Sequence, residues 1–270
     1  MPLLSILQLL LAGALAGLSA GFMGIGGGAV LTPICLLVYP AIGLTSDNLV
    51  KVIFGTNMFL VMAFSVSAVM KHHGNRKIDW RTVLVMGPLA IVGAVIGAWL
   101  ADKTDPASLK KGFAALLLFS SILITLRGST KPKGGVDRKA ILPMKLVPLV
   151  GFIGGFIGSL LGIGGGAIML PILILLFAFP MDRVAGTSSS VIVFIGLFGS
   201  IMYMWHGRGM VELPGWSTGY VWWSAALPLA IGGVPMARVG AWVNSKTNAR
   251  ILQHLFGLIL LIIAVKLLFF

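Results

Sequence analysis

The sequence predicts an all-α, polytopic membrane protein that contains two internal repeats. Of its 270 residues, 58% are apolar and only 10% are charged, and the mean hydropathy is +1.03. Polar side chains are therefore too few to cover a soluble globule. Long apolar segments follow one another along the chain, and one glycine-rich motif occurs in each half. These observations place the chain in a lipid bilayer.

The apolar segments divide the chain into a first repeat at residues 1–130 and a second repeat at 146–270. A basic polar linker at 131–145 joins them, and its Lys-Pro-Lys-Gly-Gly start has no core-forming side chain. We expect apolar segments at about 3–38, 49–70, 82–101 and 112–126, and again at about 146–180, 184–204, 218–243 and 251–269.

Each repeat opens with an apolar segment that is too long for one membrane crossing. A single helix from Leu3 to Val38 would be about 54 Å long, whereas the hydrocarbon core is about 30 Å thick. The segment must therefore break, and the glycine-rich motif is where glycine's conformational freedom allows it. A crossing with a break gives parallel repeats, whereas a chain that turns back gives inverted repeats. The distribution of Lys and Arg slightly favours the inverted arrangement.

The motif itself is Gly-Ile-Gly-Gly-Gly-Ala, at residues 24–29 and again at 162–167. A helix that starts near Ala29 or Ala167 would point its free N–H groups and partial positive charge at the glycines, which suits an anion. The candidate backbone donors are Gly24, Gly26, Gly27, Gly28, Gly162, Gly164, Gly165 and Gly166. Close helix packing is the alternative explanation, and it suits the small residues Gly13, Gly17, Gly21, Gly151 and Gly155.

Neutral side-chain donors follow in the next span of each repeat. Thr56 and Asn57 come after a glycine in the first repeat, and Thr187 and Ser188 occupy the matching positions in the second. Hydroxyl and amide groups can hold a partly dehydrated oxyanion without trapping it by a fixed charge. Hydrogen bonds to helix carbonyls are the alternative role for these side chains.

The remaining residues exclude several functions. All seven carboxylates fall in predicted loops or at span ends, which disfavours a cation carrier. The single cysteine, Cys35, excludes an intramolecular disulfide, and no catalytic, nucleotide-binding or metal-ligand motif is present, so we expect no enzyme activity, metal or cofactor. The formal charge of +13 comes from residues between apolar segments, where they orient loops rather than bind nucleic acid.

Three further groups of residues have two interpretations each. Arg238 lies well inside a predicted span and either attracts an anion to a vestibule or extends toward the lipid headgroups. The histidines His72, His73, His206 and His254 lie near predicted span ends, which indicates loop or interfacial positions rather than proton coupling. The tryptophans Trp80, Trp99, Trp205, Trp216, Trp222, Trp223 and Trp242 also lie near span ends, as in an interfacial belt rather than a stacking site.

The two glycine motifs, each followed by Pro33 or Pro171 and then by Gly-Thr-Asn or Gly-Thr-Ser, resemble the sulfite exporter TauE/SafE family of bacterial inner-membrane proteins. The resemblance covers nearly the whole chain. It implies a secondary transporter that exports sulfur-containing anions such as sulfite or organosulfonates by alternating access. An anion channel and a membrane scaffold without transport activity remain alternatives, as do protons as a coupling ion and a homodimer. We expect replacement of Gly27 or Gly165 by valine to abolish transport, and Gly13→Ala to be mild.

Overall fold

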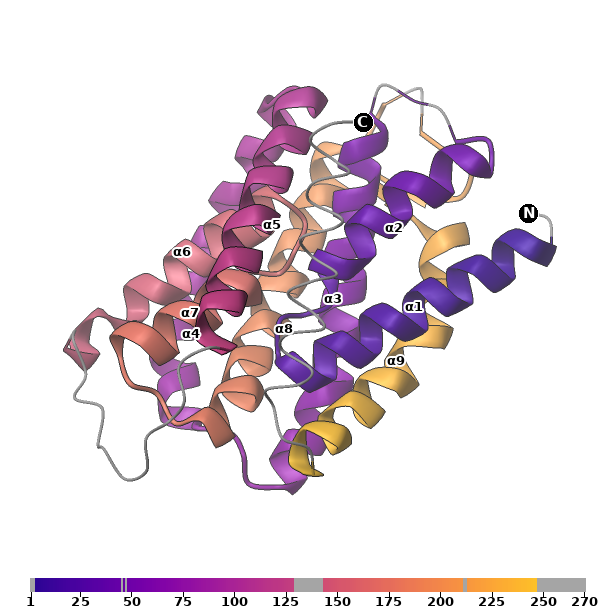
Figure 1. Cartoon of the computed structure of the whole chain (residues 1–270). Helices are drawn as coiled ribbons and strands as arrows, with labels where there is room; N and C mark the ends of the chain where they lie inside the picture. The colour runs from indigo at the N-terminus through magenta and orange to yellow at the C-terminus, as the bar shows by residue number, and fades with distance from the viewer. Residues whose placement is uncertain (1–2, 45, 47, 129–142, 211–212, 247–270) are drawn as a thin grey trace.

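The computed structural model describes residues 3–44, 46, 48–128, 143–210 and 213–246, and these residues form an almost entirely helical protein (Figure 1). The first half of the chain contains α1 (Leu3–Met23), α2 (Gly28–Ala41), α3 (Leu49–Gly74), α4 (Trp80–Lys103) and α5 (Pro106–Gly128). The second half contains a 3₁₀ turn (Met144–Leu146), α6 (Val147–Leu160), α7 (Gly166–Leu176), α8 (Met181–His206), the strands β1 (Ser217–Thr218) and β2 (Val221–Trp222), and α9 (Trp223–Lys246). The expected all-α class is confirmed.

Five helices of the described chain are long and apolar enough to cross a membrane, namely α1, α3, α4, α8 and α9. The protein is therefore a multi-pass membrane protein. The segment expected at 218–243 begins later, because residues 217–222 form an antiparallel hairpin in which Ser217 pairs with Trp222 and Thr218 with Val221. The segment expected at 251–269 and most of the linker lie outside the described residues.

Both long opening segments break at their glycines, as expected. The chain turns back at each break, because Gly27 lies beside Ala16 of α1 and Gly165 lies beside Gly154 of α6. In Figure 1 the pair α1–α2 extends to the right of the view, whereas the pair α6–α7 extends to the left. The helices α3 and α8 pack against each other between the two pairs and run in opposite directions.

Helix packing is reciprocal between the two halves. The helix α1 packs along α9, and its counterpart α6 packs along α4; similarly, α3 contacts α9 and α8 contacts α4. Glycines make these contacts close, as predicted. On α1, Gly13, Gly17 and Gly21 face Leu229, Gly233 and Ala237 of α9. On α6, Gly151 and Gly155 face Met86 and Ala90 of α4. The expectation that Gly13→Ala is mild is wrong, because a methyl group there would lie 2.8 Å from the Leu229 Cα.

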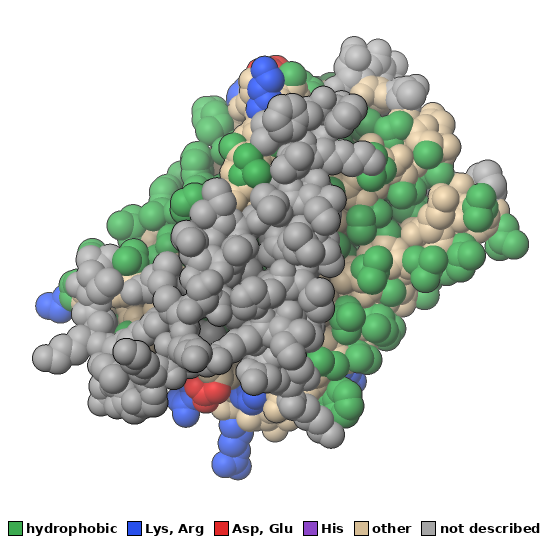
Figure 2. Space-filling view, in the orientation of Figure 1, with side chains coloured by type: hydrophobic (Ala, Val, Ile, Leu, Met, Phe, Trp, Pro, Cys, Tyr) green, Lys and Arg blue, Asp and Glu red, His purple; other side chains and the backbone are tan. Residues whose placement is uncertain are grey.

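The outer surface is apolar. Large side chains of α1 and α4 are exposed, among them Leu7, Leu15 and Leu84. In Figure 2 hydrophobic side chains cover the flank formed by α1 and α2, and Lys and Arg lie at the margins of the view. Most tryptophans are exposed as expected of an interfacial belt, but Trp222 is buried and packs edge-on against Tyr39, with ring centroids 5.1 Å apart.

Candidate functional site

Both glycine motifs form the same backbone turn. The φ angles are 71°, 85° and 80° at Gly24, Gly26 and Gly27, and 64°, 87° and 83° at Gly162, Gly164 and Gly165. A residue with a Cβ adopts this left-handed region only at a cost, so these positions require glycine for backbone geometry as well as for space. The helix α2 begins at Gly28 and α7 at Gly166, each one residue before the expected start.

The turns bring the amino end of each short helix to the opposite motif. A Cβ on Gly28 would lie 2.7 Å from the Cα of Ile163, and a Cβ on Gly166 would overlap Ile25. The first N–H groups of a helix have no acceptor within that helix, so two partial positive charges converge at this crossing. The site therefore has the donors for an anion without a charged side chain.

Two apolar side chains fill the space between the motifs. Val61 of α3 and Ile192 of α8 are fully buried. A Cβ on Gly26 would lie 3.0 Å from Val61 Cγ1 and 3.1 Å from Ile192 Cγ2, and a Cβ on Gly164 would meet the same two side chains. The two breaks therefore share one apolar contact, to which each of the two long central helices contributes one residue.

The two predicted threonines have equivalent partners. The Thr56 Oγ1 accepts a hydrogen bond of 3.0 Å from the backbone N–H of Trp222, immediately before α9. The Thr187 Oγ1 accepts one of 3.0 Å from the N–H of Asp79, immediately before α4. Each threonine thus fastens the start of a helix from the other half.

Asn57 and Ser188 occupy matching positions but bind differently. The Asn57 Nδ2 donates to the Thr32 Oγ1 of α2 over 2.7 Å. The Ser188 Oγ donates to the Gly24 carbonyl oxygen over 2.9 Å and so fixes the first glycine turn from the opposite half. The structure therefore brings Ser188 directly to a motif glycine, whereas Asn57 reaches the helix that follows the motif.

Several buried polar atoms near these residues have no partner among the described atoms. They are the Asn57 Oδ1 and the hydroxyls of Ser65, Ser159 and Ser189. An unpaired buried polar group is costly, so such a group indicates a place for water or a ligand. Sequence reasoning missed Ser65 and Ser159. The signals were available, because Ser65 lies two helical turns after Asn57 and Ser159 lies just before Gly162.

Two further side chains anchor the outer helices. The Tyr203 hydroxyl donates to the Ser159 carbonyl over 2.9 Å, and His72 Nε2 lies 3.1 Å from the Gly21 carbonyl. Because a carbonyl only accepts, Nε2 donates the proton of this hydrogen bond. His72 thus lies near a span end, as expected, but in the last turn of α3 rather than in a loop, and its side chain is fully buried.

The described charged residues lie outside the region where the glycine motifs meet. Carboxylates are found only at or next to helix ends, at Asp79, Asp102, Asp105 and Asp182. No group of three or more His, Cys, Asp or Glu residues in the described part of the chain could hold a metal ion. The buried Lys51 donates to the Asp102 carbonyl oxygen over 2.6 Å, near one end of α4. Arg238 lines a groove between α3 and α9, and no glycine of either motif lines it.

An apolar exterior, membrane-spanning helices and two broken helices that meet inside the molecule define a multi-pass membrane protein of the kind that includes transporters. The chain belongs to the sulfite exporter TauE/SafE family, whose model matches residues 9–267. The protein is a membrane transporter of this type.

Similar proteins occur in bacteria and archaea. A probable membrane transporter protein of Haemophilus influenzae is 28% identical over 261 residues, which cover 97% of each chain. The probable membrane transporter protein YunE of Bacillus subtilis is 24% identical over 98% of each chain. One from Methanocaldococcus jannaschii is 28% identical over 256 residues, covering 93% of this chain and 91% of the relative. These relatives are named as transporters rather than enzymes.

Proposed function

We propose that the protein is a secondary transporter that exports small sulfur-containing anions, such as sulfite or an organosulfonate, across a bacterial inner membrane. The family description supports the substrate class. The crossing of two glycine turns supports the location of the site, because two helix amino ends converge there with N–H donors and no carboxylate. This convergence is the observation on which the proposal depends.

The anion would bind to the backbone N–H groups of Gly26, Gly27, Gly28, Gly165 and Gly166. Those of Gly24, Gly162 and Gly164 already donate to the carbonyls of Ala20, Ser159 and Gly158, so these three predicted donors would have to give up a hydrogen bond to contribute. Ser188 is close enough to contribute, because its hydroxyl contacts the Gly24 carbonyl. Asn57 would contribute its amide, whose present partner is Thr32. Thr56 and Thr187 would contribute through their hydroxyl hydrogens, since their oxygen atoms already accept hydrogen bonds.

We propose that the halves are inverted repeats and that their relative motion gives alternating access. The opposite directions of α3 and α8 and the reciprocal packing support this arrangement. Val61 and Ile192 would act as the barrier, because they fill the space between the motifs in this conformation. Binding would then require these two side chains to separate and let the N–H groups reach the anion.

The membrane potential is sufficient to drive export. One negative charge that moves out across a negative-inside potential releases about 2.3 kcal/mol per 100 mV. Since 1.4 kcal/mol corresponds to a tenfold ratio, a monovalent anion would accumulate outside about forty-fold at that voltage. Proton coupling would add to this ratio and would appear as a dependence on the pH gradient.

The test is labelled sulfite uptake by proteoliposomes of purified protein, with voltage and pH gradient imposed independently. The proposal predicts uptake that saturates with sulfite concentration and follows the imposed voltage. Uptake that rises linearly with sulfite concentration would indicate an anion channel. Well-folded protein without uptake of sulfite or of larger sulfonates would contradict the proposal and favour a scaffold function.

A further inference from the structure

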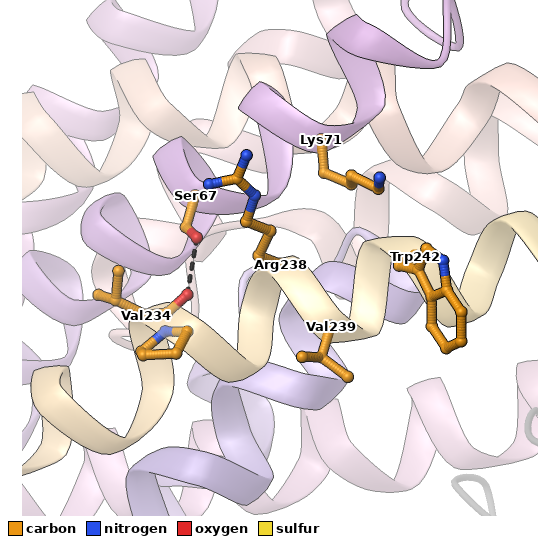
Figure 3. A pocket seen from close by; sticks show the side chains of 7 residues that line it. Ser67, Lys71, Val234, Arg238, Val239 and Trp242 are labelled. Atoms are coloured by element: carbon orange, nitrogen blue, oxygen red, sulfur yellow. Dashed lines mark hydrogen bonds between the residues drawn. The ribbon is translucent and has the colours of Figure 1, made fainter.

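A basic groove opens on the outer face of the protein, between α3 and α9. The groove has a volume of about 680 Å³ and lies between the last turns of α3 and the second half of α9 (Figure 3). Its lining residues are Ser67, Lys71, Val234, Pro235, Arg238, Val239 and Trp242.

The groove lies where a hydrogen bond joins the two halves of the chain. The Ser67 hydroxyl donates to the Val234 carbonyl over 2.6 Å and joins α3 to α9. In Figure 3 the Arg238 side chain extends from α9 toward α3 near Ser67, whereas Lys71 extends along the groove on the side of Trp242. One wall is apolar and open to the surroundings, since Val239 is 41% and Trp242 45% exposed. Two cations thus line an apolar groove at separate depths.

The electrostatics of the groove call for an anion. No described carboxylate lies within ion-pair distance of Lys71 or Arg238, and the four described acidic residues lie on other elements or in the loops next to them. A cation within a bilayer is costly unless it is paired or reaches the headgroups. In Figure 3 Arg238 extends toward α3, near Ser67, so a phosphate that enters the groove could pair with it.

The groove begins at the level of the membrane interface. Lys71 lies three residues before the end of α3, or about 5 Å, and Trp242 lies four residues before the end of α9, or about 6 Å. Tryptophan favours this level. The loop after α3 contains Arg76 and Lys77, and such basic loops face the cytoplasm, where the leaflet carries anionic lipids.

We propose that this groove binds the phosphate of an anionic phospholipid from the cytoplasmic leaflet. Lys71 and Arg238 pair with the phosphate diester, and the acyl chains lie along Val239 and Trp242. A lipid fits better than a soluble oxyanion, because the groove opens sideways through apolar side chains on the outer surface. Because α3 and α9 belong to different halves, the bound lipid would hold the junction between them. The inference does not depend on which substrate is transported.

The test is native mass spectrometry of the full-length protein in detergent, titrated with phosphatidylglycerol or with phosphatidylcholine of the same acyl chains. A basic residue near an anionic lipid surface contributes roughly a fivefold factor to binding. Lys71→Gln with Arg238→Gln is therefore expected to weaken phosphatidylglycerol binding about twenty-five-fold and to leave phosphatidylcholine binding unchanged. The control is Lys110→Gln with Lys111→Gln in α5, which removes the same charge elsewhere and should change binding less than about twofold.

The outcomes of these titrations distinguish a phospholipid from a soluble phosphate as the ligand of the groove. Equal losses in the test and control variants, or no loss in either, would overturn the proposal. Competition by soluble glycerol phosphate at equal concentration would also overturn it, since the groove would then take a free oxyanion. Arg238→Lys keeps the charge and should retain binding. If the double variant does not fold, Arg238→Gln alone should weaken phosphatidylglycerol binding about fivefold.

Discussion

Gly26→Ala tests the contact between the two glycine motifs most directly, because Gly43→Ala is a matched control for it. Gly26 has a φ of 85° and faces Val61 and Ile192. Gly43 has a φ of 86°, but nothing lies within 4 Å of the position that its Cβ would take. Alanine therefore introduces the same backbone strain at both positions, whereas only at Gly26 does the new methyl group enter the space between the two motifs.

The expected costs differ accordingly. The left-handed conformation costs a residue with a Cβ about 1–2 kcal/mol, so Gly43→Ala should lower the free energy of unfolding by that amount. At Gly26 the methyl group would lie 3.0 Å from Val61 and 3.1 Å from Ile192, so both side chains must shift by a few tenths of an ångström. Overpacking of this kind adds about 1–3 kcal/mol, for a total of about 2–5 kcal/mol.

The assay combines thermal unfolding in detergent with sulfite uptake by proteoliposomes that contain equal amounts of folded protein. Gly43→Ala should transport like the unmodified protein, whereas Gly26→Ala should lose about tenfold or more of its uptake at a temperature where it remains folded. Equal uptake by the two folded variants would refute the reasoning, because it would mean that the motifs serve only the fold.

Other residues give separable predictions. Thr56→Val and Thr187→Val should each destabilise the protein by about 1–2 kcal/mol in thermal unfolding, because each leaves a backbone N–H at a helix start without its acceptor; lost transport without lost stability would indicate direct anion contact instead. Asn57→Ala and Ser188→Ala should differ in their relative uptake of sulfite and of larger sulfonates, since their partners differ; identical profiles would count against an asymmetric site. Gly13→Ala should lower the unfolding temperature strongly, because α1 and α9 must separate to admit the methyl group, and an unchanged melting curve would contradict the packing.

The duplicated pattern predicted much of the architecture. The positions of both breaks follow from segment length, since an apolar stretch longer than the bilayer must turn or bend, and only glycines offered the required backbone freedom. The packing role of Gly17 and Gly155 follows from the spacing of small residues along a helix. The break positions and the packing glycines depend on residues that lie close together in the sequence, so one sequence was enough to predict them.

The partners of the polar side chains could not be predicted in the same way. Whether the Thr56 oxygen meets a ligand or the N–H of Trp222 depends on where a hairpin from the other half lies. The hydrogen bond of His72 to Gly21 likewise joins two helices whose approach no sequence spacing determines. The spacing of small residues indicates that Gly13 packs against a helix, but its tolerance to alanine is set by the Leu229 backbone opposite. Contacts between distant segments decide these cases.

Exchange across the membrane tests the central claim most directly. Proteoliposomes are loaded with unlabelled sulfite, and the initial uptake of labelled sulfite is compared with that of empty vesicles at zero voltage. A single site that alternates between the two faces predicts faster uptake in the loaded vesicles, and the loss of this acceleration in Gly26→Ala but not in Gly43→Ala. Uptake that does not depend on internal sulfite, or acceleration that persists in folded Gly26→Ala, would contradict alternating access at the paired glycine motifs.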